Sequence, residues 1–448
     1  MKFKHTALFA VTFFFLNAGT AQIPENVKKE IQYRINNHIN PSIAVGVLDS
    51  SGVYYYVKGY KDLENKIKAD ENTLYEIGSI TKTFTSLLLA KYAVGSIISI
   101  DDEANEFLPD SIDLTDKKGV SVTLKNLSTH SSGLPRIPNN INVTDQMNPY
   151  ANYTRSDMFS FLSHYIPRNV GKKFEYSNLG AGLLGEILSI SQNDTYQNLV
   201  KKKILTPLNL KNTYFKVPES QKENYAKGYL SQKEVPHWKF QAMAAAGGIR
   251  STIKDLVKYG ESYLKNDSPL YKAQEYTKTV QFKDQEGQLH GLAWFINPEG
   301  IIFHGGGTGG FRTFIAIDGK HGKVVAIMTN SGSSPAEDIA EYLMDPDKNP
   351  LDFAKEEMPI TAEELMDFEG NYINDGLNMT YNFSLVEDAL HAQLNNQPEF
   401  PVYYQGESTF FYKIVKAKIV FERDENNTVV GLILYQNGQE IPFIKTNP

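Results

Sequence analysis

The fold of this chain is decided by Ile77-Gly78-Ser79-Ile80-Thr81-Lys82-Thr83-Phe84, residues 77–84. An apolar run that begins at Leu74 ends here, and a helix-like segment continues from Phe84 to Ala93. A side chain three residues further along a helix points back over the same turn. Ser79 is therefore expected in the first turn of a helix, with the amine of Lys82 within hydrogen-bond reach of its hydroxyl.

A serine and a lysine placed in this way form a candidate nucleophile and base. A serine hydroxyl is a poor nucleophile unless another group takes its proton, and a lysine can do so only if burial or nearby positive charge lowers its pKa. The spacing alone is weak evidence, because the chain holds a second Ser-x-x-Lys at residues 251–254. We interpret Ser251 in that copy as a helix N-cap and Lys254 as a surface charge.

The flanking segments predict a sheet built from both ends of the first 350 residues. Runs rich in β-formers at residues 43–48 and 53–60 indicate a hairpin. A second strand region follows much later, at residues 301–304, 311–317 and 323–329, with the glycine run 305–310 at its first corner. Helical patterns lie between the two regions, at residues 156–164, 180–190 and 252–264. This order of strands, helices and strands predicts an α+β domain.

Beyond Pro359 the composition changes to short strand candidates separated by Gly and Asn turns. They lie at residues 378–385, 390–394, 410–415, 418–421, 429–435 and 440–444. Short strands at roughly regular spacing are typical of antiparallel sandwiches and barrels. We expect a separate small antiparallel β domain over residues 359–448.

The first residues read as an export signal. Lys2 and Lys4 supply a positive end, Thr6 to Leu16 is apolar, and Gly19-Thr20-Ala21 offers small residues for cleavage. The apolar run is shorter than the ~20 residues of a membrane-spanning helix. We therefore expect a signal peptide over residues 1–21 and a periplasmic or secreted protein without a membrane span.

The composition excludes several classes of function. The chain has no cysteine, so disulfides, thiolate zinc sites and cysteine nucleophiles are excluded. Its net charge of −7 gives no basic footprint for nucleic acid or anionic lipid. The histidines show no ligand spacing, and the glycine run lacks the Lys-Ser/Thr of a phosphate loop. We expect neither a metal nor a cofactor.

Five motifs follow one another along the chain. They are Ser79-Ile80-Thr81-Lys82, Leu127-Ser128-Thr129-His130-Ser131-Ser132-Gly133-Leu134-Pro135, Tyr176-Ser177-Asn178, Ala245-Ala246-Gly247-Gly248-Ile249-Arg250-Ser251-Thr252, and His304-Gly305-Gly306. In this order they resemble the serine β-lactamase and penicillin-binding protein superfamily, specifically the class C branch with its D-aminopeptidase and esterase relatives. The resemblance covers about residues 25–345, and the segment from Pro359 onward looks like the lipocalin-like β domain often appended to such hydrolases.

The resemblance implies a fold and a set of roles. The fold is an antiparallel sheet flanked by helices plus a helical subdomain, over residues 22–350, followed by a small β-barrel. Ser79 would attack a carbonyl carbon and carry the acyl group, while Lys82 and Tyr176 would share the proton transfers. Which of the two is the base stays open. The backbone N–H groups of Ser79 and Gly307 would stabilise the oxyanion.

The remaining implied roles concern substrate binding. Asn178 would bind substrate amide or carbonyl groups and help to orient Lys82. The glycines, Gly306 among them, would let the substrate lie close to the strand. At the position of His304, β-lactamases and carboxypeptidases usually have a lysine that binds the substrate carboxylate. A histidine is mostly neutral at pH 7, so efficient β-lactam hydrolysis is not to be assumed.

These features predict an exported serine hydrolase that cleaves an ester or amide through an acyl-Ser79 intermediate. The substrate is expected to be a small ester, a D-amino-acid peptide or a β-lactam. An acyltransferase that passes the acyl group to an alcohol or amine is the first alternative. A non-catalytic binder of peptidoglycan or β-lactams is the second. The sequence does not separate hydrolysis from transfer, because the difference lies in water access and pocket shape.

Overall fold

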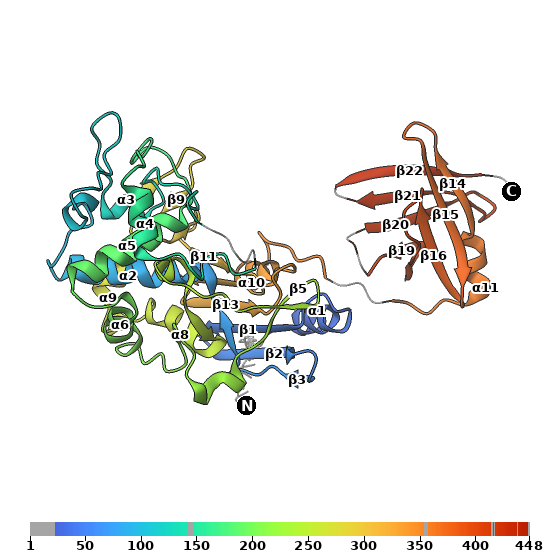
Figure 1. Ribbon diagram of the computed structural model, residues 1–448. Helices are drawn as coiled ribbons and strands as arrows, with labels where there is room; N and C mark the ends of the chain where they lie inside the picture. Colours follow the sequence, from blue (N-terminus) through green and yellow to red (C-terminus); the bar gives the residue numbers. More distant parts are fainter. Residues whose placement is uncertain are drawn as a thin grey trace, which may run out of the picture. The chain divides into compact units, whose positions relative to one another are not determined.

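The computed structural model describes residues 23–141, 147–353, 357–413, 415, 417–436 and 438–446 (Figure 1). The predicted signal peptide lies outside the described residues. Within them, no helix is both long and apolar enough to cross a membrane. The described chain divides into two compact units, one of residues 23–35 and 40–351 and one of residues 36–39 and 352–446.

The first unit is organised around a nine-stranded antiparallel sheet. Its strand order is β3-β2-β1-β13-β12-β11-β10-β9-β8, so strands from the two ends of the unit lie side by side at its centre (Figure 1). The predicted hairpin and the late strand region are both confirmed, and they pair with each other as expected. The strands are β1 (Ser42–Asp49), β2 (Gly52–Asp62), β3 (Ile67–Lys68), β8 (Phe282–Lys283), β9 (Leu289–His290), β10 (Phe295–Ile296), β11 (Ile302–Gly307), β12 (Arg312–Asp318) and β13 (Lys323–Thr329).

Helices cover this sheet and form a separate helical layer beside it. Helix α8 packs against β1, β12 and β13, and α10 packs against β12 and β13. Helix α2 is central to the helical layer, where it contacts α5, α7 and α9. The helices are α1 (Glu25–Asn36), α2 (Thr81–Val94), α3 (Leu124–Ser128), α4 (Arg155–Leu162), α5 (Asn178–Ser191), α6 (Tyr196–Val200), α7 (Ala244–Gly247), α8 (Ile253–Ser262), α9 (Tyr271–Lys278) and α10 (Glu337–Met344).

Two short ribbons and several single turns complete the first unit. The ribbon of β4 (Leu74–Glu76) and β7 (Arg250–Thr252) joins the segment before Ser79 to the segment before α8. The second ribbon pairs β5 (Gly228–Leu230) with β6 (Lys233–Val235). The single turns are η1 (Gly78–Ile80), η2 (Ala104–Phe107), η3 (Lys201–Leu205) and η4 (Glu219–Asn224).

The second unit is a nine-stranded antiparallel sheet that curls into a nearly closed barrel. Its strands are β14 (Gly370–Asn374), β15 (Met379–Val386), β16 (Ala389–Leu394), β17 (Phe400–Pro401), β18 (Tyr403–Gly406), β19 (Thr409–Phe411), β20 (Ala417–Arg423), β21 (Val429–Gln436) and β22 (Gln439–Lys445). The chain enters it through α11 (Ala362–Leu365) and the turn η5 (Met366–Phe368). The sequence missed β14, β17 and β18, because they are short or begin with glycine.

Aromatic side chains fill the interior of this barrel. Phe368, Tyr372, Phe383, Phe410 and Phe421 are all buried and form a chain of edge and tilted ring contacts. Such a filled interior is a packed core that stabilises the unit by burying large apolar surfaces. The α+β fold with a small antiparallel barrel, as expected from the sequence, is therefore confirmed.

Candidate active site

The turn that carries Ser79 is held between the sheet and the helical layer. The N–H of Ile77 donates to the carbonyl of Ile249 at 3.0 Å, and the hydroxyl of Thr313 on β12 donates to the carbonyl of Ile77 at 3.0 Å. Gly78 has a φ of +49°, which glycine adopts at little cost. The chain therefore turns directly from β4 into the 3-10 turn η1, and Ser79 lies within that turn, just ahead of α2.

Lys82 points back from α2 to Ser79. Its Nζ lies 2.9 Å from Oγ of Ser79 and 2.7 Å from the carbonyl oxygen of Ala246 in α7. The residue is 1% exposed. Burial, and after it the positive charge of Arg136, lowers the pKa of Lys82 well below its usual value. The amine is thus next to the Ser79 hydroxyl and binds a proton less tightly than an ordinary lysine.

Tyr176 lies two residues before the start of α5. Burial raises the pKa of Tyr176 to about 12, although the nearby Ser79 hydroxyl and the charge of Arg136 act to lower it. The His130 ring packs against the Tyr176 ring with centroids 4.2 Å apart, and its Nδ1 accepts a hydrogen bond from the N–H of Ser177 at 3.2 Å. His130 therefore makes a structural hydrogen bond to the segment that carries Tyr176.

His304 lies on β11 with its ring buried between Tyr176 and Phe295. Its Nδ1 lies 2.6 Å from the carbonyl oxygen of Gly305, and since a carbonyl only accepts, Nδ1 carries the proton. Its Nε2 is buried and has no hydrogen-bond partner among the described residues. Burial, and after it the Lys82 amine, lowers the pKa of His304 to about 3. His304 is thus a neutral residue at physiological pH.

The glycines of β11 allow the sheet to approach the nucleophile turn. A Cβ on Gly306 would lie 2.0 Å from the carbonyl oxygen of Ile77, and one on Gly78 would lie 2.5 Å from the backbone nitrogen of Gly307. The sequence interpretation ascribed the glycines to close approach of a substrate. At Gly306 the structure gives a different reason, because it is the protein's own backbone that occupies the space.

Asn178 begins α5 beside this group. Its Nδ2 donates to the hydroxyl of Tyr150 at 3.0 Å, and its Oδ1 is buried without a partner in the described part of the chain. No hydrogen bond between Asn178 and Lys82 occurs among the described residues, and the second partner of the Lys82 amine is Ala246. The structure thus brings Asn178 close to the site but assigns the orientation of Lys82 to a backbone carbonyl.

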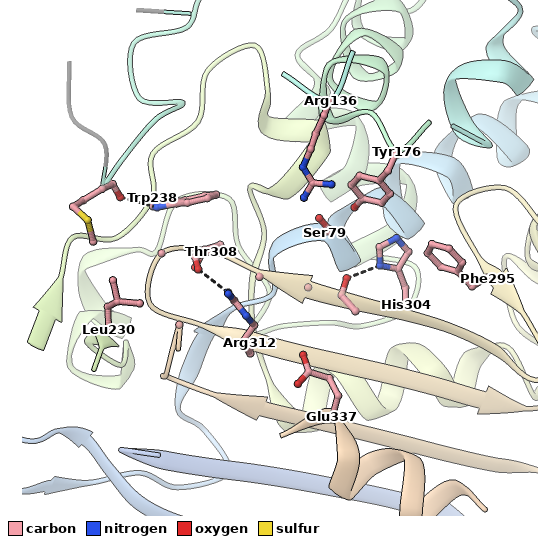
Figure 2. Close-up of a pocket in the computed structure, with 16 residues that line it drawn as sticks. Ser79, Arg136, Tyr176, Leu230, Trp238, Phe295, His304, Thr308, Arg312 and Glu337 are labelled. Carbon is pink, nitrogen blue, oxygen red and sulfur yellow. Dashed lines mark hydrogen bonds between the residues drawn. The ribbon is translucent and has the colours of Figure 1, made fainter. Parts of the chain in front are cut away.

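These residues border a cleft of about 740 Å³ (Figure 2). Of the predicted site residues, Ser79, Tyr176, His304, Gly306 and Gly307 line it, whereas Lys82 lies beneath the surface. Within the described ranges no group of three or more His, Asp or Glu side chains could hold a metal ion. The remaining lining residues are Arg136, Met147, Leu230, Trp238, Phe295, Gly305, Thr308, Gly309, Arg312, Gly332 and Glu337.

Sequence reasoning missed Arg136 and Trp238. Arg136 directly follows the second motif, and this adjacency was the available signal. Trp238 is one of two tryptophans in the chain. Its backbone N–H donates to the carboxylate of Glu76, and its indole N–H donates to the carbonyl of Met147. Their place in the cleft depends on contacts between distant segments, which no local pattern encodes.

Comparison with known proteins places the chain in a family. The Beta-lactamase family profile matches residues 27–345. A beta-lactamase of Providencia stuartii is 33% identical over 49% of this chain and 54% of its own length. A beta-lactamase of Escherichia coli (strain K12) is 29% identical over 64% of this chain and 75% of its own length. Protein flp of Staphylococcus aureus (strain N315) is 26% identical over 73% of this chain and 66% of its own length. The chain thus spans about half the length of the first of these relatives.

Solved structures share the fold. The octameric penicillin-binding protein homologue from Pyrococcus abyssi matches with a TM-score of 0.68 and 24% identity, over 95% of this chain and 96% of its own. A class C beta-lactamase in complex with cefoxitin matches with a TM-score of 0.63 and 25% identity, over 72% and 98%. The family match spans well over half of the 448 residues and includes every residue of the site described above. The chain therefore belongs to the beta-lactamase family of serine hydrolases.

Proposed function

We propose that this protein cleaves an ester or amide bond through an acyl intermediate on Ser79. The observation that carries the proposal is the contact between an accessible Ser79 hydroxyl and the buried amine of Lys82, at 2.9 Å. An unprotonated amine at this distance can accept the hydroxyl proton as Oγ attacks. Family membership supports the reaction class.

We assign the base role to Lys82 and a proton-relay role to Tyr176. The pKa of Lys82 is lowered by burial and by Arg136, so its amine is unprotonated more readily than that of an ordinary lysine. The pKa of Tyr176 is raised to about 12, so its hydroxyl keeps its proton. Tyr176 can then donate to the leaving alcohol or amine and recover a proton from Lys82. This assignment favours Lys82 among the two alternatives that the sequence left open.

The developing oxyanion needs preorganised donors. The backbone N–H groups of Ser79 and Gly307 suit this role, because the close approach of Gly78 to Gly307 brings the two backbones together. In the first step the Ser79 Oγ–carbon bond forms, the leaving group departs with a proton, and an acyl-enzyme results. In the second step water attacks the acyl carbon, and Oγ leaves with the proton. Losing one oxyanion donor typically costs about 10²- to 10³-fold in turnover.

The substrate preference follows from His304. A neutral imidazole offers no fixed charge to a substrate carboxylate, unlike a lysine at the same place. We therefore expect uncharged esters and amides to be turned over better than carboxylate-bearing β-lactams. Parallel turnover of p-nitrophenyl esters, D-alanyl peptides and nitrocefin measures this order. Fastest turnover of nitrocefin would contradict it.

The decisive experiment is covalent labelling. A fluorophosphonate should phosphonylate Oγ of Ser79 with loss of fluoride, and mass spectrometry of the digested protein locates the adduct. Ser79→Ala should not be labelled, and equal labelling of the two proteins would reject the nucleophile. Product analysis with an added alcohol or amine then separates hydrolysis from acyl transfer, because a transferred product appears only in the second case.

We also propose that the protein is exported and that residues 22–350 carry the reaction. The charge and apolar pattern of residues 1–21 supports export. All proposed catalytic residues lie between Ser79 and Gly307, within the first compact unit. The N-terminal sequence of protein recovered from the producing cell tests cleavage near Gln22. Retained labelling in a chain that ends at residue 350 tests the second point.

A further inference from the structure

The backbone of Arg136 is fixed at the start of the helix that follows Tyr176. Its carbonyl oxygen accepts the N–H of Asn178 at 3.0 Å and the N–H of Leu179 at 3.4 Å, so it caps the first turn of α5. The adjacent Pro135 carbonyl accepts the hydroxyl of Ser177 at 2.7 Å. These bonds tie the segment that carries Arg136 to the segment that carries Tyr176, so the two backbones are held next to each other.

The guanidinium of Arg136 lies over the Tyr176 ring. Its Cζ is 5.0 Å from the ring centroid, and Nζ of Lys82 is 4.9 Å from the same centroid. Figure 2 shows Arg136 reaching into the cleft toward Tyr176 and Ser79. The Arg136 guanidinium and the Lys82 amine therefore share one aromatic ring and lie at most about 10 Å apart. In the part of the chain that the structure describes, no ion pair or hydrogen bond engages this guanidinium.

The other groups around the Lys82 amine carry no fixed charge. Those that face it are the Ser79 hydroxyl in η1, the Ala246 carbonyl in α7, the Tyr176 ring ahead of α5 and the His304 ring in β11. Behind Tyr176, burial keeps His130 neutral as well. The acid in the lining of the cleft is Glu337, and burial raises the pKa of its carboxyl. Two permanent positive charges line the cleft, Arg136 and Arg312, and of the two it is Arg136 that acts on Lys82.

We propose that Arg136 is a positioning residue that supplies the fixed positive charge of the proton-transfer machinery. Its charge disfavours a second cation on Lys82 and favours loss of a proton from Tyr176, so it keeps the machinery ready to accept the proton of Ser79. Arg136 acts on both groups in the same direction. The effect is therefore independent of which of them is the base, although the inference rests on the proposed Ser79 reaction.

The test is the pH profile of free-enzyme reactivity. The rate of labelling by a neutral fluorophosphonate, and kcat/KM for p-nitrophenyl acetate, should fall as pH drops and the base becomes protonated. In Arg136→Gln this acid limb should move upward by about one pH unit, as expected for loss of a unit charge within about 10 Å. Arg136→Lys should restore the wild-type limb. Arg168→Gln removes the same charge from the exposed surface and should leave the profile unchanged.

The outcomes separate this inference from the proposed function. An acid limb that stays in place in Arg136→Gln, with only KM raised, overturns the inference, since Arg136 would then only bind substrate. A limb that moves in Arg136→Gln and equally in Arg136→Lys also overturns it, because a fixed charge would not be the cause. Absence of any Ser79-dependent labelling overturns the proposed function and this inference together.

Discussion

The two Ser-x-x-Lys segments of this chain have opposite patterns of burial. In the first, Ser79 lines the cleft and Lys82 is 1% exposed. In the second, Ser251 is 1% exposed, and the Lys254 side chain is 42% exposed and pairs with Glu71 at 3.0 Å. In the first copy the Ser79 hydroxyl is accessible and the Lys82 amine is buried. In the second copy the Ser251 hydroxyl is buried and the Lys254 amine is exposed to solvent.

The cause lies in the residues that precede each helix. Both lysines are the second residue of a helix, in α2 and in α8. Ser79 lies in a 3-10 turn that continues into its helix, so its side chain and that of Lys82 share a face. Ser251 lies in the extended strand β7, and its hydroxyl contacts Thr213 at 2.9 Å. The position before the serine is Gly78 in one copy and Arg250 in the other, and only glycine readily takes the positive φ of the turn.

The second copy also corrects a sequence interpretation. We expected Ser251 to be the N-cap of the following helix, but the N-cap is Thr252, whose hydroxyl accepts the N–H of Asp255. Ser251 pairs with Tyr75 in the ribbon of β4 and β7 instead. The expectation that Lys254 is a surface charge is confirmed. A shift of one residue in the start of a helix changes which hydroxyl caps it.

The largest contrast is expected from removing each serine. Ser79→Ala should lower kcat/KM for a p-nitrophenyl ester by at least about 10³-fold, because the nucleophile is lost. Ser251→Ala should keep activity within about twofold and lower the free energy of unfolding by about 1 kcal/mol, because the bond to Thr213 is lost. Steady-state kinetics and urea unfolding measure the two effects. Equal losses of activity in the two variants would contradict the expectation that only the first Ser-x-x-Lys takes part in the reaction.

Removing each lysine should give the next contrast. Lys82→Ala should reduce kcat by about 10²- to 10⁴-fold, the usual contribution of a well-placed proton acceptor. Lys254→Ala should leave kcat unchanged and alter the free energy of unfolding by less than about 1 kcal/mol, since its ion pair is exposed. Single-turnover acylation rates in the two variants decide the point. A large loss in Lys254→Ala would show that the second copy contributes to the reaction.

The ribbon of β4 and β7 holds the chain just ahead of both helices, and we expect the stability of the protein to depend on the buried ion pair in this ribbon. Glu76 accepts from Arg250 at 3.1 Å, and both side chains are under 10% exposed. Glu76→Ala leaves the Arg250 charge buried without its partner, and we expect a loss of about 3–5 kcal/mol in the free energy of unfolding. The matched control is Glu71→Ala, which breaks the exposed pair with Lys254 and should cost about 0–1 kcal/mol. Similar midpoints of unfolding in guanidinium for the two variants would contradict this.

The smallest expected effect is on the pH dependence of the free energy of unfolding, to which His304 contributes. The folded-state pKa of His304 is about 3, against 6.5 for the free side chain, so between these values the unfolded chain binds a proton that the folded protein does not. Stability should therefore fall as pH decreases from 6.5, by up to about 1.4 kcal/mol per pH unit. His304→Gln should reduce this slope and leave the contribution of His130, whose pKa burial also lowers. Unfolding curves at pH 4.5 to 7 test it, and an unchanged slope would show that His304 is protonated in the folded state.

The order of the elements and the candidate nucleophile were accessible from the sequence. The hairpin, the central helices and the late strands follow hydrophobic periodicity and turn residues, which are local properties. The second unit was expected as a small antiparallel domain, although three strands were missed. The roles of Asn178 and Gly306 were less accessible, because each depends on a contact with Tyr150 or Ile77 that folding creates.

The sequence by itself determined the α+β order of strands and helices, the five motifs and therefore the family. It could not distinguish one Ser-x-x-Lys from the other by that pattern alone. Only the tertiary structure decided that the pKa of Lys82 is lowered, because a pKa responds to burial and to neighbours in space. The carbonyl that holds Lys82 lies 164 residues away, at Ala246, and the charge that acts on it belongs to Arg136. The spacing of Ser79 and Lys82 in the sequence allows the two side chains to touch. The burial and the neighbouring charges that lower the pKa of Lys82 arise only when the chain folds.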